Sequence, residues 1–147
     1  MATNRVTMTA APMEVFAVLA DARCFEQWLV GCKKIRAVAG DWPEPGSKFH
    51  HRIGVGPLEV EDHTVVLECS APERLVLEAR ARPLGVARVV FELSEAAEGT
   101  SVTMHEKPVR GLAKSIDNPV LDLTVSARNQ KSLRNLKRLV ERVRSER

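Results

Sequence analysis

The stretch NPVLDLTVSARNQKSLRNLKRLVERV, residues 118–143, has the pattern of one long amphipathic helix whose inner face changes character half-way along. In the second half, an apolar stripe recurs at helical spacing through Leu133, Leu136, Val140 and Val143. Continued backwards at the same spacing, the stripe meets Asn129, Val125, Asp122 and Asn118. Three of those four side chains are polar. The fold must therefore accommodate a helix that is apolar at one end of its inner face and polar at the other.

Length and composition are those of a globular protein. With 147 residues we expect a single domain spanning residues 1–147, large enough for a sizeable core. Hydrophobic residues make up 44% and charged residues 28%, which argues against a disordered or membrane protein. No apolar run reaches the roughly 18–20 residues that span a bilayer, and the first residues lack the layout of a secretory signal. We expect a cytoplasmic location.

Motifs for metals, cofactors or nucleophiles are absent from the sequence. The three cysteines have no CxxC or Cys/His spacing, which favours reduced, mostly buried side chains over a reactive thiol: Cys24, Cys32 and Cys69. His63 shares strand parity with Glu59 and Glu61, but such alternation more often marks the solvated face of a sheet than a metal or acid–base site. Phosphate-loop, dinucleotide and hydrolase motifs are lacking. We expect no metal and no cofactor.

The net charge of +3 is concentrated at the C-terminus. From Arg128 onward there are eight basic and two acidic residues, whereas the preceding residues carry 14 basic and 17 acidic. Such a segment is compatible with binding of nucleic acid or anionic lipid. However, four cations fall opposite the apolar stripe, where a packed helix keeps its solvated face and where the helix dipole favours positive charge: Lys131, Arg134, Arg138 and Arg142. With only six aromatic residues and no Tyr, a base-stacking surface is not expected.

The remaining periodicity predicts a strand, two short helices and six further strands before the long helix. Residues 5–9 alternate as a strand, and Pro12 begins a short helix that a second short helix follows, ending at Gly31. The further strands are predicted at 33–39, 49–53, 58–69, 75–81, 87–93 and 102–106. Short connections favour an antiparallel meander, and one-sided alternation indicates that one face of the sheet is covered.

Nearly the whole chain resembles the START-like, or SRPBCC, helix-grip proteins, in particular the polyketide cyclase/dehydrase-like family. The resemblance rests on APMEVFAVLADARCFEQW (11–28), on GSKFHHRIGVGPLEVEDHTVVLECSAPERLVLEARARP (46–83), on GTSVTMHEKPVRG (99–111) and on the terminal helix. The order and spacing of these segments, rather than one motif, carry it. The resemblance implies an α+β fold in which a curved antiparallel sheet of about seven strands grips the long C-terminal helix. It also implies a cavity that usually holds an apolar or amphipathic small molecule.

The implied cavity explains the helix that is apolar at one end only. Its second half would close the core, while Asn118, Asp122 and Asn129 would face the cavity. In a dry core, each unpaired polar group would cost roughly 1–3 kcal/mol. Asn118 before Pro119 is equally a helix N-cap, and a carboxylate at Asp122 suits the helix dipole, so these two either line the cavity or only cap the helix. Asn129 has no such local role.

Further residues are candidates for the cavity wall: Trp28, Phe49, His51, Val89, Phe91, Met104 and Glu106. Strand parity puts Glu106 on the inward face, where its carboxylate would receive a ligand hydroxyl, act as a base or pair with an arginine, the last being commonest. Alternation sends His50 and His51 to opposite faces, so they are not expected to act as a unit. For Trp28, core packing is favoured over ligand contact.

Two functions remain open. The first is a carrier or sensor that binds a small hydrophobic or amphipathic molecule, lipid-like or polyketide-like. The second is an aromatase/cyclase- or dehydratase-type enzyme with His51 and Glu106 as its acid–base candidates. The absence of Tyr excludes a tyrosine general acid and favours binding. Val120 and Leu123 would support a homodimer contact, although burial would explain them equally well.

Overall fold

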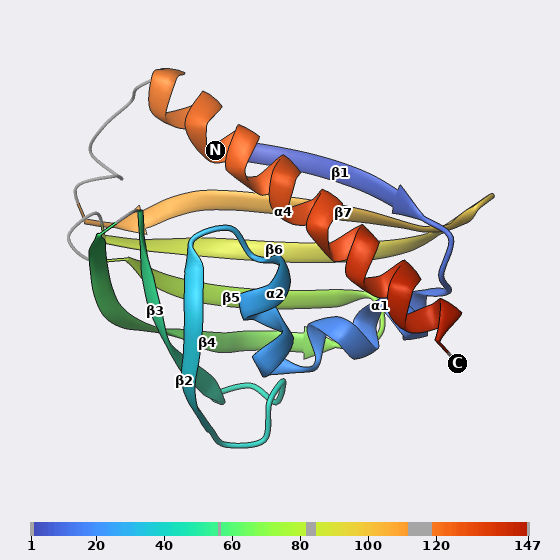
Figure 1. The fold of residues 1–147 in the computed structure, drawn as a ribbon, viewed down its shortest axis with the longest axis horizontal. Helices are drawn as coiled ribbons and strands as arrows, with labels where there is room; N and C mark the ends of the chain where they lie inside the picture. Colours follow the sequence, from blue (N-terminus) through green and yellow to red (C-terminus); the bar gives the residue numbers. More distant parts are fainter. Residues whose placement is uncertain (1, 56, 82–84, 112–118, 147) are drawn as a thin grey trace.

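The computed structural model describes residues 2–55, 57–81, 85–111 and 119–146 (Figure 1). Its centre is a seven-stranded antiparallel sheet in the order β1-β7-β6-β5-β4-β3-β2. The strands are β1 (Ala2–Met8), β2 (Cys32–Ala39), β3 (Lys48–Val55), β4 (Leu58–Ser70), β5 (Arg74–Ala81), β6 (Gly85–Ala96) and β7 (Gly99–Arg110). The expected helix-grip architecture is confirmed: a curved antiparallel sheet covered by a long C-terminal helix.

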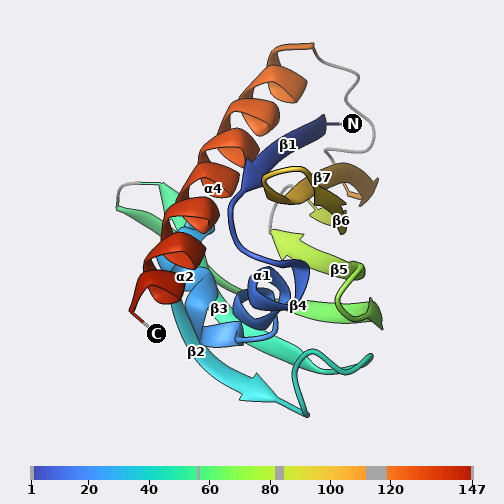
Figure 2. The same cartoon turned by 90° about the vertical axis from the view of Figure 1, so that its right-hand side faces the viewer.

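Short helices follow β1, as the sequence predicts. They are α1 (Pro12–Leu19), the 3₁₀ turn η1 (Ala22–Cys24) and α2 (Phe25–Trp28). Pro12 stands at the start of α1, and the Glu14 carboxylate accepts a hydrogen bond from the Ala11 N–H at 3.0 Å. The buried face of α1 packs between the sheet and the long helix. Figure 2 shows the sheet curving around α1 and α2.

The long helix α4 (Pro119–Ser145) has 27 residues and is therefore about 40 Å long. It runs along β1 and crosses the mouth of the curved sheet (Figures 1 and 2). Polar side chains fix its position: the Asn4 amide donates to the Ser126 carbonyl at 3.0 Å, and the Ser132 hydroxyl accepts from the Val30 N–H at 3.0 Å. The second half of α4 carries most of its buried apolar residues: Leu133, Leu136, Leu139 and Val140.

An aromatic cluster fills the middle of the core. Phe25 packs against Trp28 with ring centroids 4.8 Å apart and against Phe49 at 5.0 Å. Trp42 packs on Phe49 at 4.9 Å, and its indole N–H donates to the Leu19 carbonyl at 3.2 Å. Since residues from the short helices, the β2–β3 segment and the sheet all meet here, this cluster ties the N-terminal third of the chain to the sheet. In the described part of the chain, no helix is long and apolar enough to span a bilayer.

Candidate functional site

The inner face of the sheet changes from apolar to polar in one direction along its strands. On β3 the inner side chains pass from Phe49 to His51, and on β4 they pass backwards from Val66 through Thr64 to Asp62. The register pairs His51 with Asp62, so these two polar residues stand side by side, and it pairs Phe49 with Thr64. His51 and Asp62 therefore lie nearer to the β3–β4 connection than Phe49 does.

The strands β7 and β1, at the opposite edge of the sheet, show the same change on their inner face and in the same direction. The inner face of β7 passes from Met104 to Glu106, and that of β1 passes backwards from Val6 to Asn4. On α4 the buried residues change in the same way, from the apolar Leu136 to the polar Asn129 two turns earlier. We call the half of the interior lined by Asn4, His51, Asp62, Thr64, Glu106 and Asn129 the polar end, and the half around α1 and Leu136 the apolar end.

Glu106, Arg128 and Asn129 form a hydrogen-bonded cluster at the polar end. Arg128 Nη2 donates to Glu106 Oε1 at 2.6 Å, and Asn129 Nδ2 donates to the same oxygen at 3.2 Å. Arg128 also donates to Asn129 Oδ1 at 3.1 Å. Asn129 is completely buried, yet both ends of its amide are paired with side chains rather than with backbone. Of the roles open to Glu106, the structure therefore shows pairing with an arginine.

His51 is buried in the β3–β4 part of the polar end, with 4% of its surface exposed. Its Nε2 lies 3.0 Å from the Thr64 hydroxyl, and its Nδ1 has no hydrogen-bond partner among the described residues. Burial lowers the pKa of His51 to about 4, outweighing the Asp62 carboxylate, which raises it. The imidazole is therefore neutral at pH 7.

Trp28 is 1% exposed and presents an indole N–H that has no partner within the described residues. Its ring packs edge-on against Phe91 at 5.8 Å, so the residue is part of the core as the sequence predicts. A buried indole N–H usually finds an acceptor. Together with His51 Nδ1 and Asn4 Oδ1, it makes three unpaired polar atoms on residues that face the interior.

Two small residues stand at the centre of the concave face near the polar end. Ala79 of β5 and Ala87 of β6 are register partners, and Ala79 also pairs with Thr64. Both are only half-buried, unlike Leu77 and Val89 one step further in. Because a methyl side chain fills little volume, these two positions contribute less to packing than Leu77 and Val89 do.

The other predicted wall residues are placed as follows. Phe49, Val89, Phe91 and Met104 are all buried in the core. Asp122 is exposed in the first turn of α4, two turns before Asn129, and is not brought to the polar end. Asn118 lies outside the described residues. A cavity that holds a ligand therefore stays a prediction.

Val120 and Leu123 are not in the core. They are 69% and 71% exposed, so burial does not account for these two apolar side chains. On the outer face of the sheet, His50 stacks towards His63 at 6.0 Å while His51 points inwards, as alternation predicts. Glu61 of the same outer face pairs with Arg36 at 2.8 Å.

The cysteines are free and poorly ionised. Burial raises the pKa of the Cys32 thiol to about 12 and that of Cys24 to about 11, so both are protonated and unreactive at neutral pH. Two shallow grooves lie on the outer face of the sheet, one beside Glu78, Arg80 and Arg110 and the other beside Arg88 and Lys107.

The sequence interpretation missed Asn4, Asp62 and Thr64 of the polar end, and Arg128, which contacts it. For β4 the signal was available, because assigning Glu61 and His63 to the outer face assigns Asp62 and Thr64 to the inner one. Arg128 was counted with the basic C-terminal segment. Its contact with Glu106 joins residues 22 positions apart, which no local pattern shows.

Comparisons with known proteins agree with this architecture. The model of the family described as "Polyketide cyclase / dehydrase and lipid transport" matches residues 2–141. No curated protein matches the sequence. Among solved structures, a protein of unknown function from Staphylococcus aureus has a TM-score of 0.76 at 9% identity, covering 98% of this chain and 94% of that one. The AHSA1-like protein from Aeromonas hydrophila has a TM-score of 0.71 at 19% identity, with 96% and 92% covered.

A third similar structure is DynU16, a protein of the dynemicin biosynthetic locus. It has a TM-score of 0.70 at 18% identity, and the match covers 95% of this chain but only 46% of that one. At these identities the structures establish the fold alone.

Proposed function

The chain belongs to the polyketide cyclase / dehydrase and lipid transport family, and from this premise we propose that it binds a small amphipathic molecule between the sheet and α4. The molecule is lipid-like or polyketide-like, and the protein acts as its carrier or sensor. Its apolar part would lie against the aromatic core, and its polar part would lie at the polar end. Because the cysteines are unpaired, we further propose a reducing, cytoplasmic location.

The observation that carries this proposal is the pair of unpaired polar atoms Trp28 Nε1 and His51 Nδ1. Leaving a buried donor or acceptor unpaired costs about 1–3 kcal/mol. An indole N–H can only donate, so it requires an acceptor such as a carbonyl or hydroxyl oxygen. A neutral imidazole bonded to Thr64 through one nitrogen can pair with a hydroxyl through the other. A ligand carrying carbonyl and hydroxyl groups would satisfy both.

The apolar wall would supply most of the affinity. Ligand surface removed from water against Phe49, Phe91 and Met104 contributes about 25 cal/mol per Å². The small residues Ala79 and Ala87, which are register partners, would leave room for it beside the polar groups. Pockets of this kind, mostly apolar with a few polar groups that orient the ligand, are typical of small-molecule sites.

An enzyme of the aromatase/cyclase or dehydratase type is the alternative, and the contact between His51 and Thr64 beside the buried Asp62 favours it. Two features weigh against it. A histidine with a pKa of about 4 is a poor base at neutral pH, and the Glu106 carboxylate is held by Arg128. The Glu106→Gln and His51→Ala variants would abolish turnover of a candidate polyketide only if the alternative holds.

Titration with a hydrophobic fluorescent probe tests binding. The Ala87→Phe substitution fills the space on the inner face, and we expect it to weaken probe binding at least tenfold. Val90→Phe, which adds a phenyl ring to the outer face of the same strand, is the matched control and should leave binding unchanged. Equal binding by both variants would place the probe elsewhere and contradict the proposal.

A further inference from the structure

The outer face of α4 is also divided into two halves. On a helical projection at about 100° per residue, ten residues of α4 fall within an arc of about 100° opposite Asn129 and Leu136. Two of them are Glu141, which is half-buried, and Ser145, which is the last residue of the helix. The other eight are Val120, Leu123, Thr124, Ala127, Lys131, Arg134, Arg138 and Arg142. We call these eight residues the outer stripe of α4. Every one of them is exposed, so the stripe is a continuous surface, apolar in its first two turns and cationic afterwards.

The four cations of the outer stripe differ from other arginines of this helix. Arg128 is bonded to Glu106, and Arg144 lies 3.7 Å from the Glu14 carboxylate. Among the described residues, no ion pair is formed by Lys131, Arg134, Arg138 or Arg142. Glu141, which lies in the same arc as these cations, is turned to Thr9 and accepts a hydrogen bond from its N–H at 3.1 Å. The positive charge of the stripe is therefore available to a partner.

The apolar half of the stripe lies at the N-terminal end of α4. Val120 and Leu123 are the two most exposed large hydrophobic residues described in the chain, at 69% and 71%. Exposed apolar side chains beside a row of cations on one helix face are the pattern of a helix that lies on an anionic lipid surface. The leucine and valine would enter the headgroup region, and the cations would contact lipid phosphates.

Other partners match this surface less well. Two copies of the stripe packed in parallel would oppose cation to cation, and packed antiparallel they would oppose cations to Val120 and Leu123. A nucleic acid would use the cations but offers nothing to the aliphatic residues, and the stripe has no aromatic side chain for base stacking. A bilayer with anionic headgroups accounts for both halves at once.

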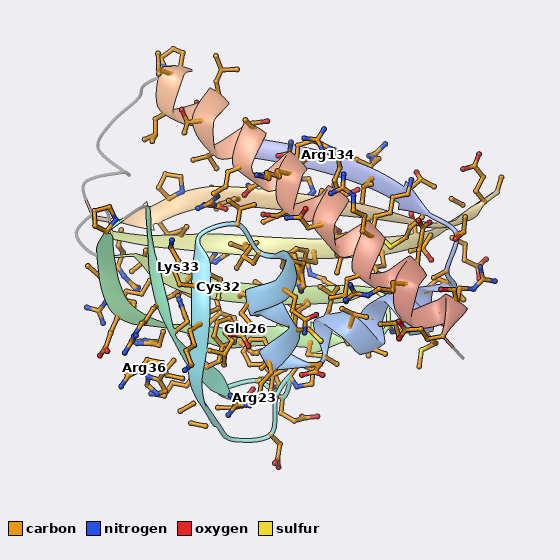
Figure 3. All side chains as sticks on the ribbon, in the orientation of Figure 1. Arg23, Glu26, Cys32, Lys33, Arg36 and Arg134 are labelled. Carbon is orange, nitrogen blue, oxygen red and sulfur yellow. The ribbon has the colours of Figure 1, made fainter. Side chains whose placement is uncertain are left out.

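We propose that the outer stripe of α4 docks the protein on anionic membranes. The inference goes beyond the proposed function and does not depend on it, since docking requires no occupied interior. Arg134 lies in the middle of the stripe, whereas Lys33 and Arg36 on β2 lie well away from it in Figure 3. The exposed pair Lys33 and Lys34 therefore offers a control with the same charge at another place.

Co-flotation with vesicles tests the proposal on the full chain. The protein should bind vesicles of phosphatidylcholine mixed with phosphatidylglycerol, bind pure phosphatidylcholine much less, and be released by salt as the charges are screened. Each cation near an anionic surface is worth about a fivefold change in binding. The Arg134→Glu/Arg138→Glu double variant should therefore lose well over tenfold, and Lys33→Glu/Lys34→Glu several-fold less.

The apolar half is tested separately. Leu123→Ser should weaken vesicle binding several-fold while leaving its salt dependence unchanged, because it removes buried apolar area and no charge. Equal losses in the two charge-reversal variants would show that net charge alone is responsible and would overturn the proposal. So would vesicle binding that ignores lipid charge, preferential binding to duplex DNA, or a dimer in sedimentation that Leu123→Ser dissociates.

A failure of the proposed ligand binding can be distinguished from a failure of the proposed membrane docking. Probe titration of the Arg134→Glu/Arg138→Glu variant should give unchanged affinity, because neither residue faces the interior. Loss of both activities in that variant would indicate unfolding, which circular dichroism detects. In that case, the Arg134→Gln/Arg138→Gln variant repeats the test with a smaller perturbation and an expected loss of more than tenfold.

Discussion

The two ends of the interior use one scaffold in opposite ways. At the apolar end, Leu136 and Val140 of α4 meet Leu19 and Val102 in a core in which every one of these side chains is buried. At the polar end, the same helix face and the same strands present Asn129, Glu106 and His51. The apolar end therefore holds the sheet and the helix together, and the polar end contributes less to their packing.

This division lets the apolar end fix the position of α4. Burial at the apolar end stabilises the docked helix, while Asn4 and Ser132 fix its distance from β1 and from the residues after α2. The interior can therefore tolerate unpaired groups such as Trp28 Nε1 in the core and His51 Nδ1 at the polar end, whose cost the rest of the core offsets. Under the proposed function, stability and binding are assigned to different halves of the same helix.

The sharpest contrast is between Leu136 and Leu123 on that helix. Leu136→Ala removes a fully buried side chain of the apolar end and should lower the free energy of unfolding by about 2–5 kcal/mol. Leu123→Ala, at an exposed position, should change it by less than about 0.5 kcal/mol. Urea denaturation measures both. A small cost at Leu136 would mean that the apolar end does not hold the helix.

Acidification should lower the free energy of unfolding through protonation of His51 at the polar end. Its pKa is about 6.5 when unfolded and about 4 when folded, so the unfolded chain binds more protons between these values. The contribution of neutral His51 to the free energy of unfolding is about 3 kcal/mol. It is complete above pH 6.5 and is lost as the pH falls to about 4.

The His51→Gln variant cannot take up that proton, so its unfolding free energy should fall less over the same pH range. His50→Gln, on the outer face of the same strand, is the control and should keep the wild-type dependence. Parallel pH profiles for all three proteins would show that His51 is not buried in a neutral form.

A smaller effect is expected at the Glu106 cluster. Glu106→Ala leaves the buried Asn129 amide without its acceptor and should cost about 1–3 kcal/mol. Glu92→Ala removes a carboxylate that pairs with Arg74 at 3.2 Å on the exposed outer face, and should cost below about 1 kcal/mol. If both substitutions lower the free energy of unfolding equally, the Glu106 cluster is as solvated as the surface. That result would contradict the distinction between the polar end and the apolar end.

Much of this could be predicted from the sequence. The 3.6-residue period of 133–143 and the alternation of the strands predicted the order of elements, and Asn129, one of the three polar residues in the inner stripe, marked the end of the interior that differs. The strands were predicted too short, as at β6 and β7, because the hydrogen-bonded ladder continues beyond the apolar alternation. The facing of Asp122 was not predictable, because its helical turn is apolar nearly all round.

The contacts that define the candidate site were beyond sequence reasoning. The bonding of Glu106 by Arg128 depends on how α4 is rotated against β7, and the unpaired state of Trp28 Nε1 depends on which acceptors the fold leaves near it. Similarly, the exposure of Val120 and Leu123 follows from how α4 is rotated, which turns them away from the core. Each is set by tertiary packing, which periodicity does not report.

Native mass spectrometry of the protein purified from cells tests the central claim, that the polar end accommodates an amphipathic guest. The account predicts a small molecule that co-purifies with the wild-type protein and with Val90→Phe, and that is absent from Ala87→Phe. Wild-type protein that is consistently empty and also fails to bind hydrophobic probes, or a guest retained in full by Ala87→Phe, would contradict it.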